Sequence, residues 1–481
     1  MKKTLLRMIS VALVLAFVIM LIPSNSLKAA SVTYKGTWGD NLEWELEDGV
    51  LTIYGKGEMK DGNWFTDDDP ECGKVTKIVV SEGITSIGDN AFYREYNLKS
   101  VVLPSTLKTI GQDSFMHCTK LESINFPKNL TEIGFRSFKD SGLKKVKIPS
   151  KIKEIKKYTF EDCVNLKSVT LNKNLEKIDS SAFLGTAIKS ITIPKKCTEL
   201  NNFAFADCKN LKKIKVASGN KAFVVENGVL FNKDKSLLIL YPPKKSGKTY
   251  EIPATVTEIS GGAFSYAKSL KSFTVASGNT SFVAENGILF SYDKTKLVRY
   301  PTGRSGDYEI PESVTELAHS AFKTSGIVNV TLPSNLEKMG LSAFSNCKKL
   351  SEITIPDKVK EISGNAFIGC DSLKKAVVGE GVEVLATSCF EDCIKLSEVT
   401  VGSSLKKIDG NVFRRDGNLK KITINSDKLI NIFIGSFSFE DINEFAEIQF
   451  KATDNPNFKE IKDAIIGNGQ APKSVTFTRI Y

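Results

Sequence analysis

Nine cysteines and two histidines are the side chains of this 481-residue chain best suited to nucleophilic or metal chemistry. Six of the cysteines share one place, three residues after a phenylalanine: Cys118, Cys163, Cys208, Cys347, Cys370 and Cys393. A metal centre or a catalytic dyad needs groups from different segments that converge on one point. Cysteines at one recurring spacing predict instead a ladder of small buried side chains, because a free thiol packs like a small hydrophobic group. Disulfides between adjacent members are the alternative, although an odd total favours free thiols.

His117 and His319 are the only histidines, and no nucleophile elbow, HExxH motif or phosphate-binding loop accompanies them. The acidic segment 67–71, DDDPE, could offer oxygen ligands to calcium, but it lacks the spaced ligands and the turning glycine of a calcium loop. A solvated loop is therefore favoured there. We expect no enzyme, no cofactor and no metal.

The elements that carry these residues form a repeat. One phenylalanine marks each unit: Phe92, Phe115, Phe138, Phe160, Phe183, Phe205, Phe264, Phe322, Phe344, Phe367, Phe390, Phe413 and Phe437. Successive phenylalanines are 22 to 24 residues apart, except for two gaps of 59 and 58 residues. A fixed period of this length over thirteen copies predicts a solenoid, in which each unit contacts only its neighbours.

Each unit has the pattern of a short strand followed by a turn. In the stretch 121–127, LESINFP, apolar and polar side chains alternate before Pro127, which predicts a strand with one buried face that ends at the proline. We expect a β-rich solenoid of about 13 turns of 22–23 residues, with a parallel sheet and short helical turns. At about 4.8 Å per strand the stack would be a rod of roughly 60 Å. The two histidines, nine repeats apart, would not meet in it.

The unit pattern x-F-x-x-C-x-x-L-x-x-I-x-I-P-x-x-L-x-x-I resembles the repeat of the BspA-like leucine-rich repeat proteins of bacteria. The resemblance covers about residues 84 to 450, and segment 39–59 is similar to a short module that often precedes these repeats. It implies a leucine-rich-repeat fold and a secreted or cell-surface protein of bacteria, with adhesion to host or bacterial proteins as one function of the family.

The first 30 residues have the pattern of a secretory signal peptide. Lys2, Lys3 and Arg7 precede an apolar run over residues 9–22, and small residues follow at Ala29 and Ala30. The run is shorter than the ~20 residues of a spanning helix, so a retained anchor is the weaker alternative. Cleavage would also remove Lys28 and lower the net charge from +11 to +7. We expect no membrane insertion after cleavage.

Both ends of a solenoid need caps, because each leaves an open sheet edge and an open core. Residues 31–80 hold all three tryptophans and a hairpin pattern that turns at Asp48-Gly49, so they predict an N-terminal β cap over the repeats of 81–450. The tryptophans could instead line a sugar site, but covering the core is favoured. Residues 451–481 predict a C-terminal cap, with a helical pattern at 455–469 and a strand at 473–481.

The two long gaps contain nearly identical segments, ASGNKAFVVENGVLFNKDK from Ala217 and ASGNTSFVAENGILFSYDK from Ala276. Each has two apolar runs joined by polar residues, which predicts β-hairpin inserts at about 217–250 and 276–308. We expect these inserts to be dispensable for stacking. Neither contains a histidine or cysteine, so a repeated structural part is favoured over a repeated catalytic centre.

The outward positions of the first strand form a face rich in serine, threonine and lysine. Lys145 and Lys147 in one unit, and Lys213 and Lys215 three units later, double the positive charge, which is unfavourable for the sheet itself. We hypothesise that these four lysines contact an acidic glycan or an acidic protein segment, although a plain solvent face remains the alternative.

The expected function is extracellular binding or adhesion, with host extracellular proteins, bacterial surface proteins or acidic glycans as partners. A scaffold or spacer of the cell envelope without a specific ligand is the alternative. We expect a monomer that does not bind nucleic acid, because a net charge of +7 is modest and lysine alternates with glutamate.

Overall fold

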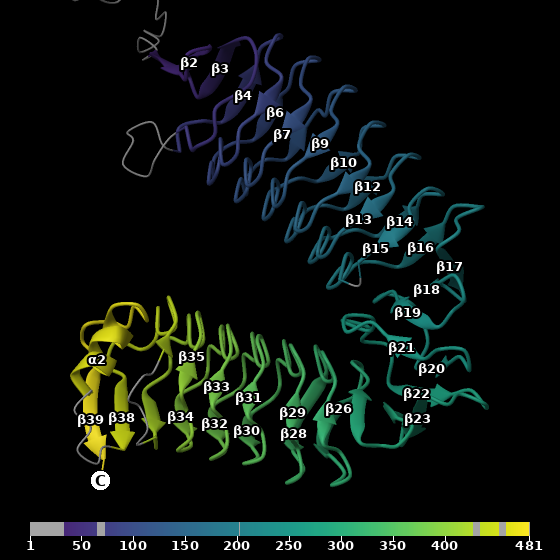
Figure 1. Ribbon diagram of the computed structural model, residues 1–481, viewed down its shortest axis with the longest axis vertical. Coiled ribbons are helices and arrows are strands. Elements are labelled where there is room, and N and C mark those ends of the chain that lie inside the picture. The colour runs from purple at the N-terminus through teal and green to yellow at the C-terminus, as the bar shows by residue number, and fades with distance from the viewer. Residues whose placement is uncertain (1–32, 65–72, 202, 427–432, 452–457, 481) are drawn as a thin grey trace, which may run out of the picture.

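The computed structural model describes residues 33–64, 73–201, 203–426, 433–451 and 458–480. The expected signal peptide and the acidic segment 67–71 lie outside the described residues. The chain forms a β-solenoid of about 17 turns with almost no helix, which confirms the predicted solenoid and adds turns to the thirteen expected. Figure 1 shows two arms that meet at a sharp bend, so the molecule is V-shaped and the predicted straight rod is wrong.

Two columns of short strands run along the solenoid. The first column contains β4 (Lys77–Val80), β6 (Ser100–Val102), β8 (Ser123–Ile124), β10 (Lys145–Lys147), β12 (Ser168–Thr170), β14 (Ser190–Ile193), β16 (Lys213–Val216), β20 (Thr249–Ile252), β22 (Ser272–Val275), β26 (Ser305–Glu309), β28 (Gly326–Thr331), β30 (Glu352–Ile355), β32 (Lys375–Val378), β34 (Glu398–Val401), β36 (Lys421–Ile424), β38 (Glu447–Lys451) and β39 (Thr476–Ile480). The second contains β5 (Ser86–Ile87), β7 (Thr109–Ile110), β9 (Glu132–Ile133), β11 (Glu154–Ile155), β13 (Lys177–Ile178), β15 (Glu199–Leu200), β19 (Leu237–Leu240), β21 (Glu258–Ile259), β25 (Lys296–Arg299), β27 (Glu316–Leu317), β29 (Lys338–Met339), β31 (Glu361–Ile362), β33 (Val384–Leu385), β35 (Lys407–Ile408) and β37 (Phe433–Ile434). Bonded neighbours within each column pair in parallel, with equivalent positions opposite one another.

Stacked phenylalanines, one in each turn, form a spine at the centre of each arm. From Phe92 to Phe205 the centroids of successive rings are 5.3–5.6 Å apart, and from Phe322 to Phe413 they are 4.7–5.8 Å apart. The rings are buried, so each turn completes the core of the next. The thirteenth marker is an exception, because Phe439 stacks on Phe413 while Phe437 is 40% exposed. Phe437 lies two residues before the buried ring, at a backbone position with positive φ.

The predicted cysteine ladder is present. The six repeat cysteines are buried and free, and each thiol donates to the carbonyl of the spine phenylalanine in the preceding turn, at 3.0–3.2 Å. The thiol therefore satisfies a buried acceptor, and burial raises the pKa of Cys163 to about 12. Two turns place a carboxyl group at the same position, Glu95 and Asp416, and both are buried.

The N-terminal segment covers the open core with aromatic rings. β1 (Tyr34–Trp38), β2 (Leu42–Glu47) and β3 (Val50–Gly55) form an antiparallel sheet whose last strand pairs in parallel with β4. Trp64 is buried against Phe92 at a centroid distance of 6.0 Å, and Trp38 stacks on Trp64 at 4.8 Å. This packing supports core coverage rather than a sugar site. At the other end, α2 (Phe458–Ile466) covers the core, and β39 pairs with β38.

The two nearly identical segments, which begin at Ala217 and Ala276, each supply a complete extra turn. In the first, β17 (Phe223–Glu226) and β18 (Val229–Asn232) form an antiparallel excursion, and β19 returns to the second column. In the second, β23 (Phe282–Glu285) and β24 (Ile288–Ser291) do the same before β25. Tyr241 and Tyr300 then take the place of the spine phenylalanine, each donating its backbone N–H to the next turn. Each insert is therefore more than a hairpin.

A buried asparagine explains why the two segments share their first residues. The Asn220 amide donates to the carbonyls of Pro194 and Cys197 in the preceding turn, both at 2.8 Å, and its oxygen accepts two backbone N–H groups. Asn279 makes the equivalent four bonds in the second segment. The asparagine fixes the point at which each excursion leaves the solenoid.

The bend lies at these two extra turns. In ordinary turns the residue two positions after the spine phenylalanine projects in a loop that bonds to the next loop, as Arg94 N does to Met116 O at 2.9 Å. The Tyr241 and Tyr300 turns lack this loop, so the loops on either side approach each other. Tyr266 N donates to Thr324 Oγ1 at 2.9 Å, although the two residues are 58 positions apart. The solenoid consequently bends toward the loop side.

The bend interrupts the core, and the expectation that the inserts are dispensable is corrected by this arrangement. The spine is continuous only within each arm, because the buried core of the described residues divides into three clusters at the bend. Deleting 219–249 would remove Leu230, Phe231 and Tyr241 from that core, so the first insert is not dispensable for stacking.

Replacing Phe344 by alanine should lower the free energy of unfolding by about 3–5 kcal/mol, because the ring is buried between two others. Phe437→Ala is the matched control and should cost less than about 1 kcal/mol, because its ring is exposed. Urea denaturation of both variants measures the difference. Equal losses would refute the stacked spine as the source of stability.

Glu95 should make stability depend on pH. Burial raises the pKa of its carboxyl group from 4.5 to about 7, so the folded state holds the proton more tightly than the unfolded state. The stability contribution is therefore complete below about pH 4.5 and is lost as the pH rises through about 7. Glu95→Gln should be more stable than the parent by about 1–3 kcal/mol near pH 8 and nearly equal to it near pH 5 in urea denaturation. A difference independent of pH would contradict this assignment.

Candidate ligand-binding surfaces

The four lysines predicted as a site lie on the first column of the N-terminal arm. Lys145 and Lys147 project from β10, and Lys213 and Lys215 project from β16, all four exposed to solvent. The strands between them, β12 and β14, present serine and threonine at the equivalent positions. The face is thus a strip of hydroxyl groups with a pair of lysines on each side.

The same face of the C-terminal arm compensates its own charge. Lys375 lies between Glu352 and Glu398 in the parallel register, and its Nζ is 3.4 Å from a Glu398 carboxylate oxygen. Lys421 likewise lies between Glu398 and Glu447. Within the described residues none of the four lysines of the N-terminal arm has such an ion pair. The two described strand faces therefore differ: the lysines of the C-terminal arm lie beside glutamates, whereas the lysines of β10 face serine and threonine on β12, and those of β16 face serine and threonine on β14.

A shallow hollow of about 400 Å³ lies between the two lysine pairs. Thr170, Ser190 and Thr192 from the strand face line it, together with Lys173 and Lys195 from the turns that follow β12 and β14. These two lysines were not predicted, because they lie just outside the alternating pattern of the strands. Their signal was the position just after the strand, in LNKN and IPKK. Lys173 and Lys195 thus line a hydroxyl-bearing hollow on the two strands that separate the lysine pairs.

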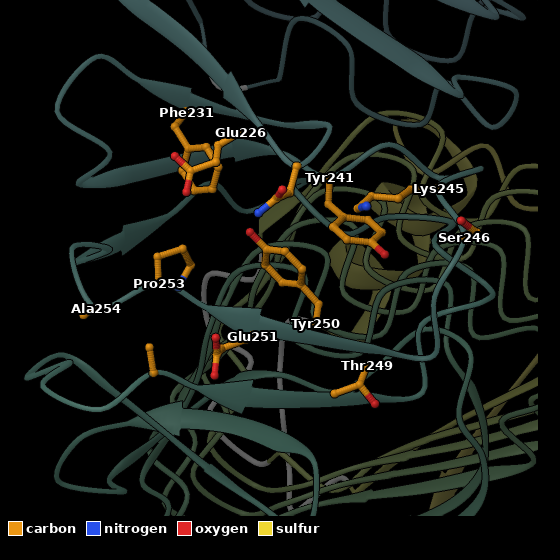
Figure 2. Close-up of a pocket in the computed structure, with 12 residues that line it drawn as sticks. Glu226, Phe231, Tyr241, Lys245, Ser246, Thr249, Tyr250, Glu251, Pro253 and Ala254 are labelled. Atoms are coloured by element: carbon orange, nitrogen blue, oxygen red, sulfur yellow. The ribbon is translucent and has the colours of Figure 1, made fainter.

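A second hollow, of about 430 Å³, lies in the first insert. Figure 2 shows Tyr241 and Tyr250 on one side of it and the carboxylates of Glu226 and Glu251 on the other. The two tyrosine rings are 5.1 Å apart between centroids, and burial raises the pKa of both phenols. Since Tyr241 is buried, only the half-buried Tyr250 offers part of its ring to a ligand. The close contact of these two tyrosine rings is therefore explained by the packing of the extra turn.

The second insert builds the same arrangement with Tyr300 and Tyr308, whose centroids are 5.5 Å apart. There the Arg304 guanidinium lies over the Tyr300 ring and donates to the carbonyl of Asn286 at 2.6 Å. The same pair of tyrosine rings thus occurs in both inserts, and in the second a cation covers it. This recurrence supports a structural role for both pairs.

The histidines have separate structural contacts. His117 Nδ1 is 2.9 Å from an Asp140 carboxylate oxygen, and His319 Nδ1 accepts a hydrogen bond from Leu341 N at 2.9 Å. In the part of the chain that the structure describes, no group of three or more metal-binding side chains is placed to hold an ion. None of the described helices is long and apolar enough to cross a membrane. The expected absence of enzymatic activity stays a prediction.

Comparison with known proteins identifies the repeat. The family model described as the BspA type leucine rich repeat region matches residues 85–212, 244–292 and 304–420 in 6 copies. No curated protein sequence matches the chain at a significant level.

Among solved structures, a leucine-rich repeat protein from Eubacterium ventriosum is 28% identical, with 89% of this chain and 97% of that chain covered and a TM-score of 0.44. A leucine rich cell surface protein from Faecalibacterium prausnitzii is 23% identical, with coverages of 76% and 94% and a TM-score of 0.44. The pneumococcal vaccine antigen PcpA is 20% identical, with coverages of 93% and 99% and a TM-score of 0.45. The family match extends over more than half of the sequence, on both sides of the bend, and the chain therefore belongs to the BspA-type leucine-rich repeat family.

Proposed function

We propose that the chain is an extracellular binding protein whose N-terminal arm contacts an acidic glycan or an acidic protein segment through its strand face. The expected signal peptide and the family support an extracellular or cell-surface location, and one similar structure is described as a cell surface protein. The proposal rests mainly on the charge asymmetry between the arms: the lysines of β10 and β16 have no ion pair among the described residues, whereas Lys375 and Lys421 lie between glutamates of adjacent strands.

An external anion accounts for this asymmetry. Lysines that stack on one face without counter-ions repel one another and weaken the sheet, whereas lysines opposite glutamates do not. A multivalent acidic ligand would neutralise both pairs at once, since strands β10 and β16 are three turns, or roughly 14 Å, apart. The hydroxyl-lined hollow between them would accept the polar backbone of the ligand.

Changing Lys145, Lys147, Lys213 and Lys215 together to glutamate should weaken binding to immobilised mucin by about tenfold or more at low salt. Thermal unfolding should remain nearly unchanged, because all four side chains are exposed. The measurement is surface plasmon resonance at several salt concentrations, in which parent binding should weaken as salt rises.

The matched control changes four exposed lysines elsewhere, Lys108, Lys360, Lys395 and Lys459, to glutamate and has the same net charge. It should bind mucin almost as well as the parent. Equal binding by the parent and the strand-face variant would refute the strand face as the contact surface. Absence of saturable binding to mucin, matrix proteins and bacterial walls would favour the alternative of a scaffold or spacer.

A further inference from the structure

The bend encloses a basic pocket that the strand face does not share. It has a volume of about 790 Å³ and is lined by the edges of six consecutive turns, between the spine loop and the first-column strand. Its cations are Lys209, Lys244, Lys268, Arg304, Lys348 and Lys349, and no aspartate or glutamate lines it. The pocket exists only because the two extra turns draw these edges together.

Direct contacts between distant segments hold the walls of the pocket in place. Lys323 Nζ is 2.7 Å from an Asp207 carboxylate oxygen, although 116 residues separate them. The fully buried Arg299 donates to the carbonyls of Ser320 and Gly261 and so joins two turns. The pocket is therefore formed in advance, and a ligand need not pay for ordering it.

Most of the positive charge in the pocket has no counter-ion. Lys348 pairs with Asp371 at 2.7 Å, and Lys209 lies over the Tyr266 ring at 4.9 Å from its centroid. Lys244, Lys268 and Lys349 are exposed and make no ion pair within the described ranges. The nearby Asp207 is already occupied by Lys323. Cations gathered around one concave surface raise the local concentration of anions.

The other lining groups indicate which anion fits. Ser269, Ser305, Asn210 and Asn346 place hydroxyl and amide groups among the cations, which suits a ligand that carries hydroxyl groups as well as negative charge. The volume lies within the range of small-ligand sites, about 300–1,000 Å³. A nucleic-acid strand would need exposed aromatic platforms, whereas Tyr266 is half-buried beneath Lys209. We propose that the bend pocket binds an acidic oligosaccharide through Lys244, Lys268 and Lys349.

This site is independent of the proposed strand-face function. The two surfaces share no lining residue. The strand-face hollow is lined by residues between 169 and 195 and by Ala217, and the bend pocket by Lys209, Asn210 and residues between 243 and 349 on other edges of the turns. Failure of one site to bind therefore leaves the other intact, and variants at each surface distinguish them.

The test is titration calorimetry of the full chain with a sulfated, heparin-derived hexasaccharide at about 0.1 M salt. The parent should bind it, and changing Lys209, Lys244, Lys268 and Lys349 together to glutamine should weaken binding by about tenfold or more. The strand-face variant should still bind the hexasaccharide through the bend pocket, and Lys108, Lys360, Lys395 and Lys459 changed to glutamine should keep the parent affinity. Binding unchanged in the pocket variant, or lost equally in the strand-face variant, overturns the assignment.

Lys349→Glu alone provides a second measure, because it places a carboxylate on the pocket without altering any buried group. It should also weaken hexasaccharide binding, with an unchanged melting temperature. Octaglutamate and tripolyphosphate test the ligand class, and both should bind more weakly than the hexasaccharide. If either binds as tightly, the pocket recognises charge alone and the oligosaccharide assignment is wrong.

Discussion

Every level of this structure depends on the stacking of one aromatic ring per turn on the ring of the next turn. A unit of 22 or 23 residues cannot enclose a core of its own, so its phenylalanine is buried only when both neighbours are present. The Phe344 ring, for example, has the rings of Phe322 and Phe367 on either side, at 4.7 and 5.3 Å. This requirement also explains the caps, because Trp64 at the first turn supplies the ring that a preceding turn would have supplied.

The bend arises from a change in the loops while the strand columns continue. Tyr241 and Tyr300 keep their turns in register with the following turn through the same backbone hydrogen bond that the phenylalanines make. The loop that normally follows the ring is missing in both turns, and the flanking loops close the space, as the contact of Tyr266 with Thr324 shows. A repeated segment thus changes the direction of the solenoid without ending it (Figure 1).

Charge is distributed unevenly along this scaffold. The strand face of the C-terminal arm places lysine beside glutamate in adjacent turns, whereas the strand face of the N-terminal arm places lysine beside serine and threonine, and no acidic residue lines the bend pocket. Since exposed ion pairs contribute little to stability, a folded solenoid tolerates either arrangement. The fold therefore does not require the uneven distribution, and each of the two proposed binding surfaces rests on its own group of lysines.

The sequence alone predicts the repeat, the parallel strands and the cysteine ladder, because these follow from side-chain spacing within one unit. It also placed Lys145 and Lys213 on the exposed face, since alternation fixes which side of a strand a residue occupies. The two extra turns were missed because tyrosine replaces phenylalanine there, although Tyr241 precedes Phe264 by the usual 23 residues. The bend and its basic pocket could not be predicted from the sequence. Both depend on loops that are absent from two turns and on contacts between segments up to 116 residues apart, which no local pattern encodes.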